Sequence, residues 1–221
     1  TDKLDSRVGD EIKRLGAEEI IIVGGQNSVS EKVREDLKAY DADKNVERIA
    51  GADRYGTSEM VAKRVVGITG KKNTGVVASG QVFPDALSVG TFASREGYPI
   101  LLVKKDSVPS QIQNAIKDLD INKTYIAGGT NTISKSTEAN IPNVVERMAG
   151  STRYETSVAI AKSKFGASKE AYIASGEEFA DALVISPISG KFNRPTLLVS
   201  RNKNSNSPVK TYIRNAGFTS I

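Results

Sequence analysis

The stretch GVVASGQVFPDALSVG, residues 75–90, decides the fold because it reads as strand, turn and helix in succession. The run GVVAS is short, apolar and rich in valine, which is typical of a buried strand. Ser79-Gly80 then indicates a turn. Pro84 suits the first turn of a helix, and Asp85 interacts favourably with the helix dipole there. A strand followed directly by a helix is the building unit of a parallel α/β sheet.

This unit is repeated along the chain. ASGQVFPDALSVG (78–90) shares seven residues with ASGEEFADALVIS (174–186), and RIAGADRYGTS (48–58) shares seven with RMAGSTRYETS (147–157). IIIVGGQNSVS (20–30) likewise returns as TYIAGGTNTIS (124–134), and PILLV (99–103) as PTLLV (195–199). Four matched blocks in the same order indicate a tandem duplication of about 100 residues.

The two ends of the chain carry a third, broken copy. VGDEIKRLGAEEI (8–20) aligns with VKTYIRNAGFTSI (209–221). We therefore expect residues 1–19 to be the C-terminal helix of a preceding repeat and residues 218–221 to begin the strand of the next one. Repeat A is expected to span residues 20–122 and repeat B residues 123–217.

The remaining elements follow from similar patterns. IIIVGG reads as a strand and a tight turn, and Ser28 to Glu31 as the capping box of a helix. RIAGADRYGTS is expected to form a loop before a further helix, and PILLV a third strand. Strands that are apolar on both faces and alternate with helices predict an α/β fold, with small, mainly parallel sheets flanked by helices.

The glycine-rich turns are expected at the carboxyl ends of the strands, where open parallel sheets bind ligands. These turns are Gly24-Gly25, Ser79-Gly80, Gly128-Gly129 and Ser175-Gly176, with Asn27 and Asn131 beside two of them. Gly24-Gly25 matches neither a P-loop nor a dinucleotide-binding fingerprint, so no cofactor is expected.

Composition excludes several functions. The 221 residues include no histidine and no cysteine, which excludes Ser-His-Asp and Cys-His catalysis and the usual zinc sites. The net charge of +5 permits an anionic partner. The sequence has no basic tail of the kind that binds nucleic acid, so no nucleic-acid partner is expected. It also has no apolar stretch long enough for membrane insertion.

The duplicated arginines and tyrosines are the first candidate site. Arg54-Tyr55 and Arg153-Tyr154 could brace a loop and fill the interface between repeats. Alternatively the arginines could face an anion, because guanidinium groups suit phosphate and carboxylate. Arg48 and Arg147 could join that cluster or pair with the glutamates that precede them.

The repeated aspartates are the second candidate. Asp85 and Asp181 each fall in the first turn of an expected helix, which favours a structural role; a pair of catalytic carboxylates is the alternative. Asp53 is replaced by Thr152 in repeat B, so no role there requires a carboxylate in every repeat.

Together these motifs resemble the cell-wall-binding repeat type 2 family of Gram-positive surface proteins, which includes S-layer proteins, adhesins and autolysins. The motifs are R-x-A-G-x-x-R-Y-x-T-S, A-S-G-x-x-F-x-D-A-L, Pro-Ile-Leu-Leu and G-G-x-N-x-[VI]-S. The resemblance implies repeats in threes around a pseudo-threefold axis, which anchor proteins to an anionic wall polymer. Only two intact repeats are visible in this chain.

The resemblance predicts a secreted, non-catalytic anchor that binds an anionic glycopolymer of the cell wall or S-layer. Other S-layer proteins or a third repeat are possible further partners. A lattice-assembly module and a wall hydrolase are the alternatives. The residues predicted to bind polymer are Arg48, Arg54, Tyr55, Arg147, Arg153, Tyr154, Pro99, Ile100, Leu101, Leu102, Pro195, Leu197 and Leu198. From the motif alone, the Pro-Ile-Leu-Leu element reads as a buried strand that shapes a groove.

Overall fold

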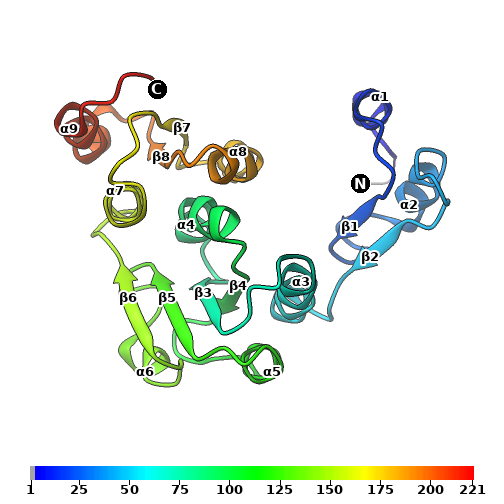
Figure 1. The fold of residues 1–221 in the computed structure, drawn as a ribbon, viewed down its shortest axis with the longest axis horizontal. Coiled ribbons are helices and arrows are strands. Elements are labelled where there is room, and N and C mark those ends of the chain that lie inside the picture. The colour runs from blue at the N-terminus through cyan, green and yellow to red at the C-terminus, as the bar shows by residue number, and fades with distance from the viewer. Residues whose placement is uncertain (1–2) are drawn as a thin grey trace. The chain divides into compact units, whose positions relative to one another are not determined.

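The structure, a computed structural model, describes residues 3–221. The chain divides into two compact units, one ending at Val61 and the other beginning at Ala62. Figure 1 shows the elements of both units along the chain.

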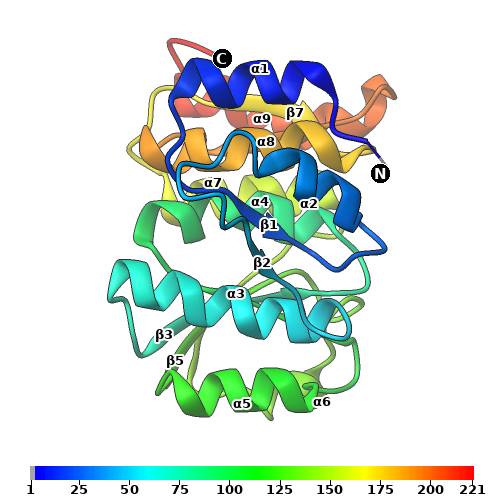
Figure 2. The ribbon, with the colours of Figure 1, turned by 90° about the vertical axis from the view of Figure 1, so that its right-hand side faces the viewer.

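The first unit is a small parallel α/β fragment. It contains α1 (Ser6–Leu15), β1 (Ile21–Val23), α2 (Glu31–Leu37), β2 (Glu47–Ile49) and the start of α3 (Arg54–Thr69) (Figure 2). β1 and β2 pair in parallel, with Ile21 opposite Glu47. Ile22, Val33, Leu37 and Val46 form its core.

The second unit holds two separate parallel sheets. Its strands are β3 (Thr74–Ser79), β4 (Ile100–Val103), β5 (Lys123–Ala127), β6 (Val144–Met148), β7 (Tyr172–Ser175) and β8 (Thr196–Val199). The first sheet has the order β4-β3-β5-β6, and the second consists of β7 and β8. Every strand pairing is parallel, so the predicted fold class is confirmed.

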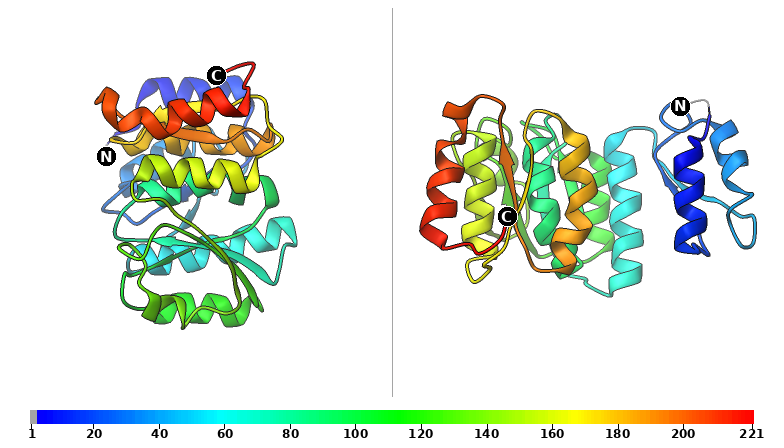
Figure 3. Two further views of the ribbon diagram at one scale, coloured as in Figure 1. Left: turned by 90° about the vertical axis from the view of Figure 1, so that its left-hand side faces the viewer. Right: turned by 90° about the horizontal axis from the view of Figure 1, so that it is seen from above.

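Helices connect these strands and cover the sheets. They are α4 (Pro84–Glu96), α5 (Ser110–Asp118), α6 (Lys135–Glu138), α7 (Arg153–Lys164), α8 (Phe179–Lys191) and α9 (Ser207–Ala216), with a 3-10 turn, η1 (Lys203–Asn206). Phe92 of α4 packs in the main core with Val76, Met148 and Ile160. α4 and α8 lie against each other, as do α7 and α9, which run side by side in Figure 3.

The four-stranded sheet crosses the expected repeat boundary at residues 122 and 123. β3 and β4 come from repeat A, whereas β5 and β6 come from repeat B, and Thr74 lies opposite Lys123. Each sheet of this kind therefore needs two consecutive repeats. The repeat boundaries themselves stay a prediction from the sequence.

Two local predictions were wrong. RIAGADRYGTS is not a loop, because Arg48 lies in β2 and α3 begins at Arg54. The capping box at Ser28 does not form. Ser30 is the N-cap of α2, and its hydroxyl accepts a hydrogen bond from the Val33 amide at 3.3 Å. A hydroxyl must stand immediately before the first helical residue to reach that amide.

Candidate functional site

The duplicated motifs of the two repeats meet at the carboxyl edge of the four-stranded sheet. Asp85 projects from the first turn of α4 and is 6% exposed. Its Oδ2 accepts a hydrogen bond from the Thr132 hydroxyl at 3.3 Å, just beyond the Gly128-Gly129 turn. An aspartate of repeat A is thus held by the glycine turn of repeat B.

Burial dominates the electrostatics of this carboxyl. Loss of water raises the pKa of Asp85 above its ordinary value. Hydrogen bonds from Thr132 and Thr156 and the charge of Arg153 oppose that rise without cancelling it. A buried carboxyl fixed by two hydroxyls is suited to joining repeats, since its oxygens already have partners.

The contact of Asp85 with Thr132 and the Gly128-Gly129 turn forms the joint between the two repeats. Only glycine fits at position 128 in this joint. Its φ is +110°, where L-residues are strained, and a Cβ there would collide with Asp85 Oδ2 and lie 2.6 Å from Thr132 Oγ1. Gly24 has a φ of +116° at the equivalent position in the first unit. This backbone requirement explains why the first glycine of each pair recurs.

Arg48 and Arg147 clamp these glycine turns. The Nη1 atom of Arg48 donates to the Gly24 carbonyl at 2.8 Å, and that of Arg147 donates to the Gly128 carbonyl at 2.7 Å. Arg48 Nη2 also lies 3.5 Å from Glu31, and Arg147 Nη2 lies 3.1 Å from Glu138. Both arginine side chains are only 13% exposed. Their partners are not the preceding glutamates that the sequence suggested.

Helices α3 and α7 begin at equivalent positions of the duplicated motif, but their N-terminal caps differ. In α3, Asp53 Oδ1 accepts from the amides of Tyr55 and Gly56 at 2.9 and 2.8 Å. In α7, Thr152 is the N-cap and forms a capping box with Glu155. The exchange of Asp53 for Thr152 therefore replaces one N-cap by another.

Arg153 and Tyr154 lie where the repeats join. Arg153 is exposed, donates to the Gly176 carbonyl at 2.5 Å, and its guanidinium lies 5.9 Å from the Phe83 ring centre. Tyr154 is half-buried and packs against Leu87. In the first unit, Arg54 is exposed and Tyr55 is buried.

In each Pro-Ile-Leu-Leu element, the proline immediately precedes a strand and the next three residues form part of it. The Pro99 carbonyl accepts from the Val76 amide, and the Pro195 carbonyl from the Tyr172 amide, each at 2.9 Å. Leu101, Leu197 and Leu198 have no exposed area. Pro99 and Pro195 are buried, and Ile100 and Leu102 are half-buried. The three buried leucines cannot touch a polymer directly, because the core encloses them; their contribution is to shape the sheet.

Equivalent positions of α4 and α8 differ sharply in exposure. Leu87 is 6% exposed and Leu183 57%, while Ser88 is 1% exposed and Val184 73%. Asp85 is buried, whereas Asp181 is exposed. Repeat B covers this face of α4 in part through α7 and α8. Among the described residues of the second unit, no third copy covers the same face of α8.

The sequence did not identify Thr132, Thr156 and Glu138 as parts of this joint. Thr132 and Thr156 could have been found from their motifs, since each falls in a duplicated block. Within residues 3–221, no group of three or more acidic side chains could hold a metal ion. The helices of that part of the chain are too short or too polar to cross a membrane.

Comparison with known proteins identifies the repeats. The family described as Cell wall binding domain 2 (CWB2) matches residues 48–138 and 147–220. Among curated relatives, an amidase enhancer of Bacillus subtilis is 34% identical over 204 residues, which is 91% of this chain and 27% of that protein. The N-acetylmuramoyl-L-alanine amidase LytC of the same organism is 30% identical over 213 residues, 96% of this chain and 41% of that protein.

Solved structures show the same architecture. Cwp6 from Clostridium difficile superposes with a TM-score of 0.85 at 28% identity, covering 96% of this chain and 34% of that one. Cwp8 from the same organism gives 0.78 at 27% identity, covering 95% and 37%. This chain therefore spans well under half of each of these four relatives.

Proposed function

The chain belongs to the cell wall binding domain 2 family, and from that premise we propose that it is a non-catalytic anchor for an anionic secondary wall polymer. Its repeats are cell wall binding repeats of a cell-surface protein. The proposed anchor holds a secreted protein on the wall or in an S-layer, while any catalysis resides in other parts of the parent protein.

One observation carries this proposal: the motif R-x-A-G-x-x-R-Y-x-T-S occurs in both repeats, and its second arginine is exposed in each. Arg54 and Arg153 remain at the surface at the starts of α3 and α7. A guanidinium suits phosphate or carboxylate, and one such group per repeat gains by multivalency on a repeating polymer. We assign polymer contact to these two arginines and a bracing role to Arg48 and Arg147.

A protein-protein role has separate support. Leu183, Val184 and Ile188 expose an apolar face on α8, and Phe179 and Phe192 extend it. Exposed patches of this kind mark interaction surfaces. Because the equivalent face of α4 lies against repeat B, a further repeat of the same family is the proposed occupant.

A wall hydrolase has little support. Acid-base catalysis would need carboxyls that reach the polymer, yet Asp85 is buried and bonded to the Thr132 hydroxyl. Turnover on purified peptidoglycan, with and without Asp85→Asn and Asp181→Asn, tests this alternative. We expect no turnover by the chain itself.

Co-sedimentation with isolated Gram-positive walls tests the anchoring proposal. We expect binding to intact walls, loss of binding after acid extraction of the secondary polymer, and weaker binding as salt increases. Arg54→Met and Arg153→Met should each weaken binding roughly tenfold, since a charge-assisted hydrogen bond is lost. Lys72→Met, which removes one exposed charge outside these motifs, is the control. Undiminished binding to acid-extracted walls would refute the proposal and favour protein-protein contact.

A further inference from the structure

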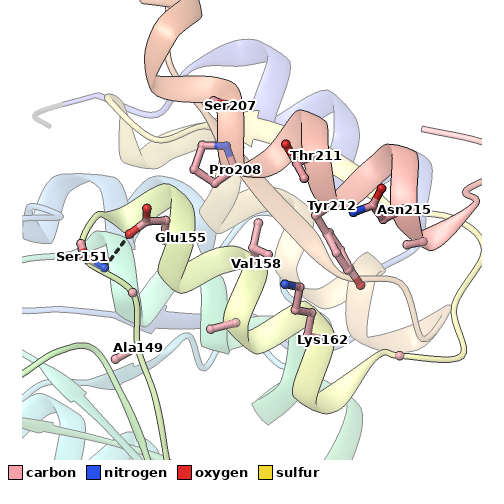
Figure 4. A pocket seen from close by; sticks show the side chains of 14 residues that line it. Ala149, Ser151, Glu155, Val158, Lys162, Ser207, Pro208, Thr211, Tyr212 and Asn215 are labelled. Carbon is pink, nitrogen blue, oxygen red and sulfur yellow. Dashed lines mark hydrogen bonds between the residues drawn. The ribbon is translucent and has the colours of Figure 1, made fainter.

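A long groove runs between α7 and α9 in the second unit (Figure 4). Its volume is about 760 Å³, which is within the range of small-molecule sites. Ser151 and Glu155 line one end, Lys162 and Asn215 line the other, and Thr211 and Tyr212 lie along α9. None of these residues is among those predicted to bind polymer, although Ser151 and Glu155 lie within the repeated stretch RMAGSTRYETS.

Repeat A contains a lysine equivalent to Lys162, but there the lysine has a carboxylate partner. Lys63 is equivalent to Lys162, and it forms an ion pair with Asp118 of α5 at 2.8 Å. The counterpart of Asp118 in α9 is Asn215, because Asp120 and Gly217 occupy the same left-handed position after the two helices. Repeat B therefore keeps the cation and replaces its carboxylate by a neutral amide.

A second lysine adds charge at the same end. Lys169 corresponds to Asn73, and its ammonium group donates to the carbonyl of Ala216, which lines the groove, at 3.0 Å. Lys162 lies 5.8 Å from the ring centre of Tyr212, a contact that leaves its ammonium able to meet an anion. The nearby carboxylate of Glu170 pairs with Arg194. This end of the groove thus carries two lysines, Lys162 and Lys169, whereas the charges of Lys63 and Asp118 cancel in repeat A.

The other end of the groove suits sugar hydroxyls. Glu155 uses one oxygen, Oε2, to accept the amides of Ser151 and Thr152 at 2.7 and 3.2 Å. The hydroxyl-bearing residues Ser151, Ser207 and Thr211 line the groove with it. Hydroxyls and amides can both donate and accept, as sugar recognition requires.

We propose that the groove between α7 and α9 is a subsite for one anionic sugar unit of a wall glycopolymer. The carboxylate or phosphodiester of that unit meets Lys162 beside Asn215, and its hydroxyl groups lie toward Ser151 and Thr211. This inference rests on the proposed anchoring function. It adds a site that is separate from Arg54 and Arg153 and belongs to repeat B.

Exchange between the repeats provides the sharpest test. Asn215→Asp recreates the ion pair of repeat A and should lower affinity about tenfold without loss of stability, because a neutralised lysine no longer attracts an anion. Lys162→Met should give a similar loss. Lys63→Met is the matched control and should leave affinity unchanged.

The probe is the soluble polymer released by acid from isolated walls, titrated into the complete chain by calorimetry, with thermal melting as a check on folding. If the unmodified chain binds but Asn215→Asp and Lys162→Met bind equally well, the groove proposal is overturned and the anchoring function stands. If the unmodified chain fails to bind, both are overturned.

Competition identifies the anion. Alginate oligosaccharides supply sugar carboxylates, a glycerol phosphate polymer supplies phosphodiesters, and dextran is the neutral control. We expect one or both anionic probes to displace the wall polymer from the unmodified chain more strongly than from Asn215→Asp. Equal displacement by dextran would overturn an anionic subsite.

Discussion

Replacing Gly128 by alanine tests whether the joint between the repeats depends on this one backbone position. A side chain at a φ of +110° costs about 1–3 kcal/mol in backbone strain. The new Cβ would also collide with Asp85 Oδ2 and crowd Thr132 Oγ1 at 2.6 Å. We expect a total loss of about 3 kcal/mol or more, which lowers Tm by roughly 6–12 °C for a unit of this size.

The chain supplies two matched controls for this change. Gly24→Ala meets the same strain at +116° but has Ser28 Cβ as its nearest neighbour at 3.5 Å, so it should cost only the strain. Gly129→Ala lies 3.8 Å from the nearest atom and has no positive φ, so it should change stability by less than about 0.5 kcal/mol.

Thermal and urea unfolding of the three variants measures these differences. In a double-mutant cycle, Asp85→Ala should relieve part of the cost of Gly128→Ala, because the colliding carboxylate is gone. Equal melting temperatures for Gly128→Ala and Gly129→Ala would refute the argument, since they would show that the joint tolerates a side chain.

Three further predictions follow from the same contacts. Because burial raises the pKa of Asp85, its contribution to stability is largest at low pH and is lost as pH rises through the folded-state pKa. Asp85→Asn should therefore gain stability relative to the unmodified chain as pH rises above about 4, the ordinary pKa of an aspartate; urea unfolding at several pH values checks the sign, and a constant difference would contradict it. Arg147→Met removes charge-assisted hydrogen bonds to Gly128 and Glu138 and should cost about 2 kcal/mol, as measured by urea unfolding, while wall binding of the folded fraction stays unchanged. Ser30→Ala should cost about 1 kcal/mol and Ser28→Ala less, because only Ser30 caps α2; a larger loss from Ser28 would restore the capping box inferred from sequence.

Much of the fold could be read from local patterns. Buried strands such as Thr74–Ser79 appear in the sequence as continuous apolar runs because both faces of a parallel sheet are covered. The helix at Pro84 was found because proline suits the first helical turn. The start of α3 was missed because its N-cap, Asp53, lies inside a motif that was interpreted as a single loop.

The candidate site was less predictable. Four arginines share one motif, yet Arg48 and Arg147 are largely buried while Arg54 and Arg153 are exposed. The difference arises because Arg147 donates to the carbonyl of Gly128, just beyond the neighbouring strand β5, and no local pattern places that carbonyl. The groove between α7 and α9 has no sequence motif of its own. What distinguishes it is the neutral Asn215 at the position where repeat A has Asp118.

The sequence by itself determined the duplication, the alternation of strand and helix, and the glycine pairs that follow two of the strands. Only the tertiary structure decided that β3 and β4 of one repeat share a sheet with β5 and β6 of the next. A periodic sequence looks the same wherever its repeat is taken to begin. Hydrogen bonds between strands that are distant in the sequence determine which strands form one sheet. Tertiary packing also determines which arginines are buried and which are exposed.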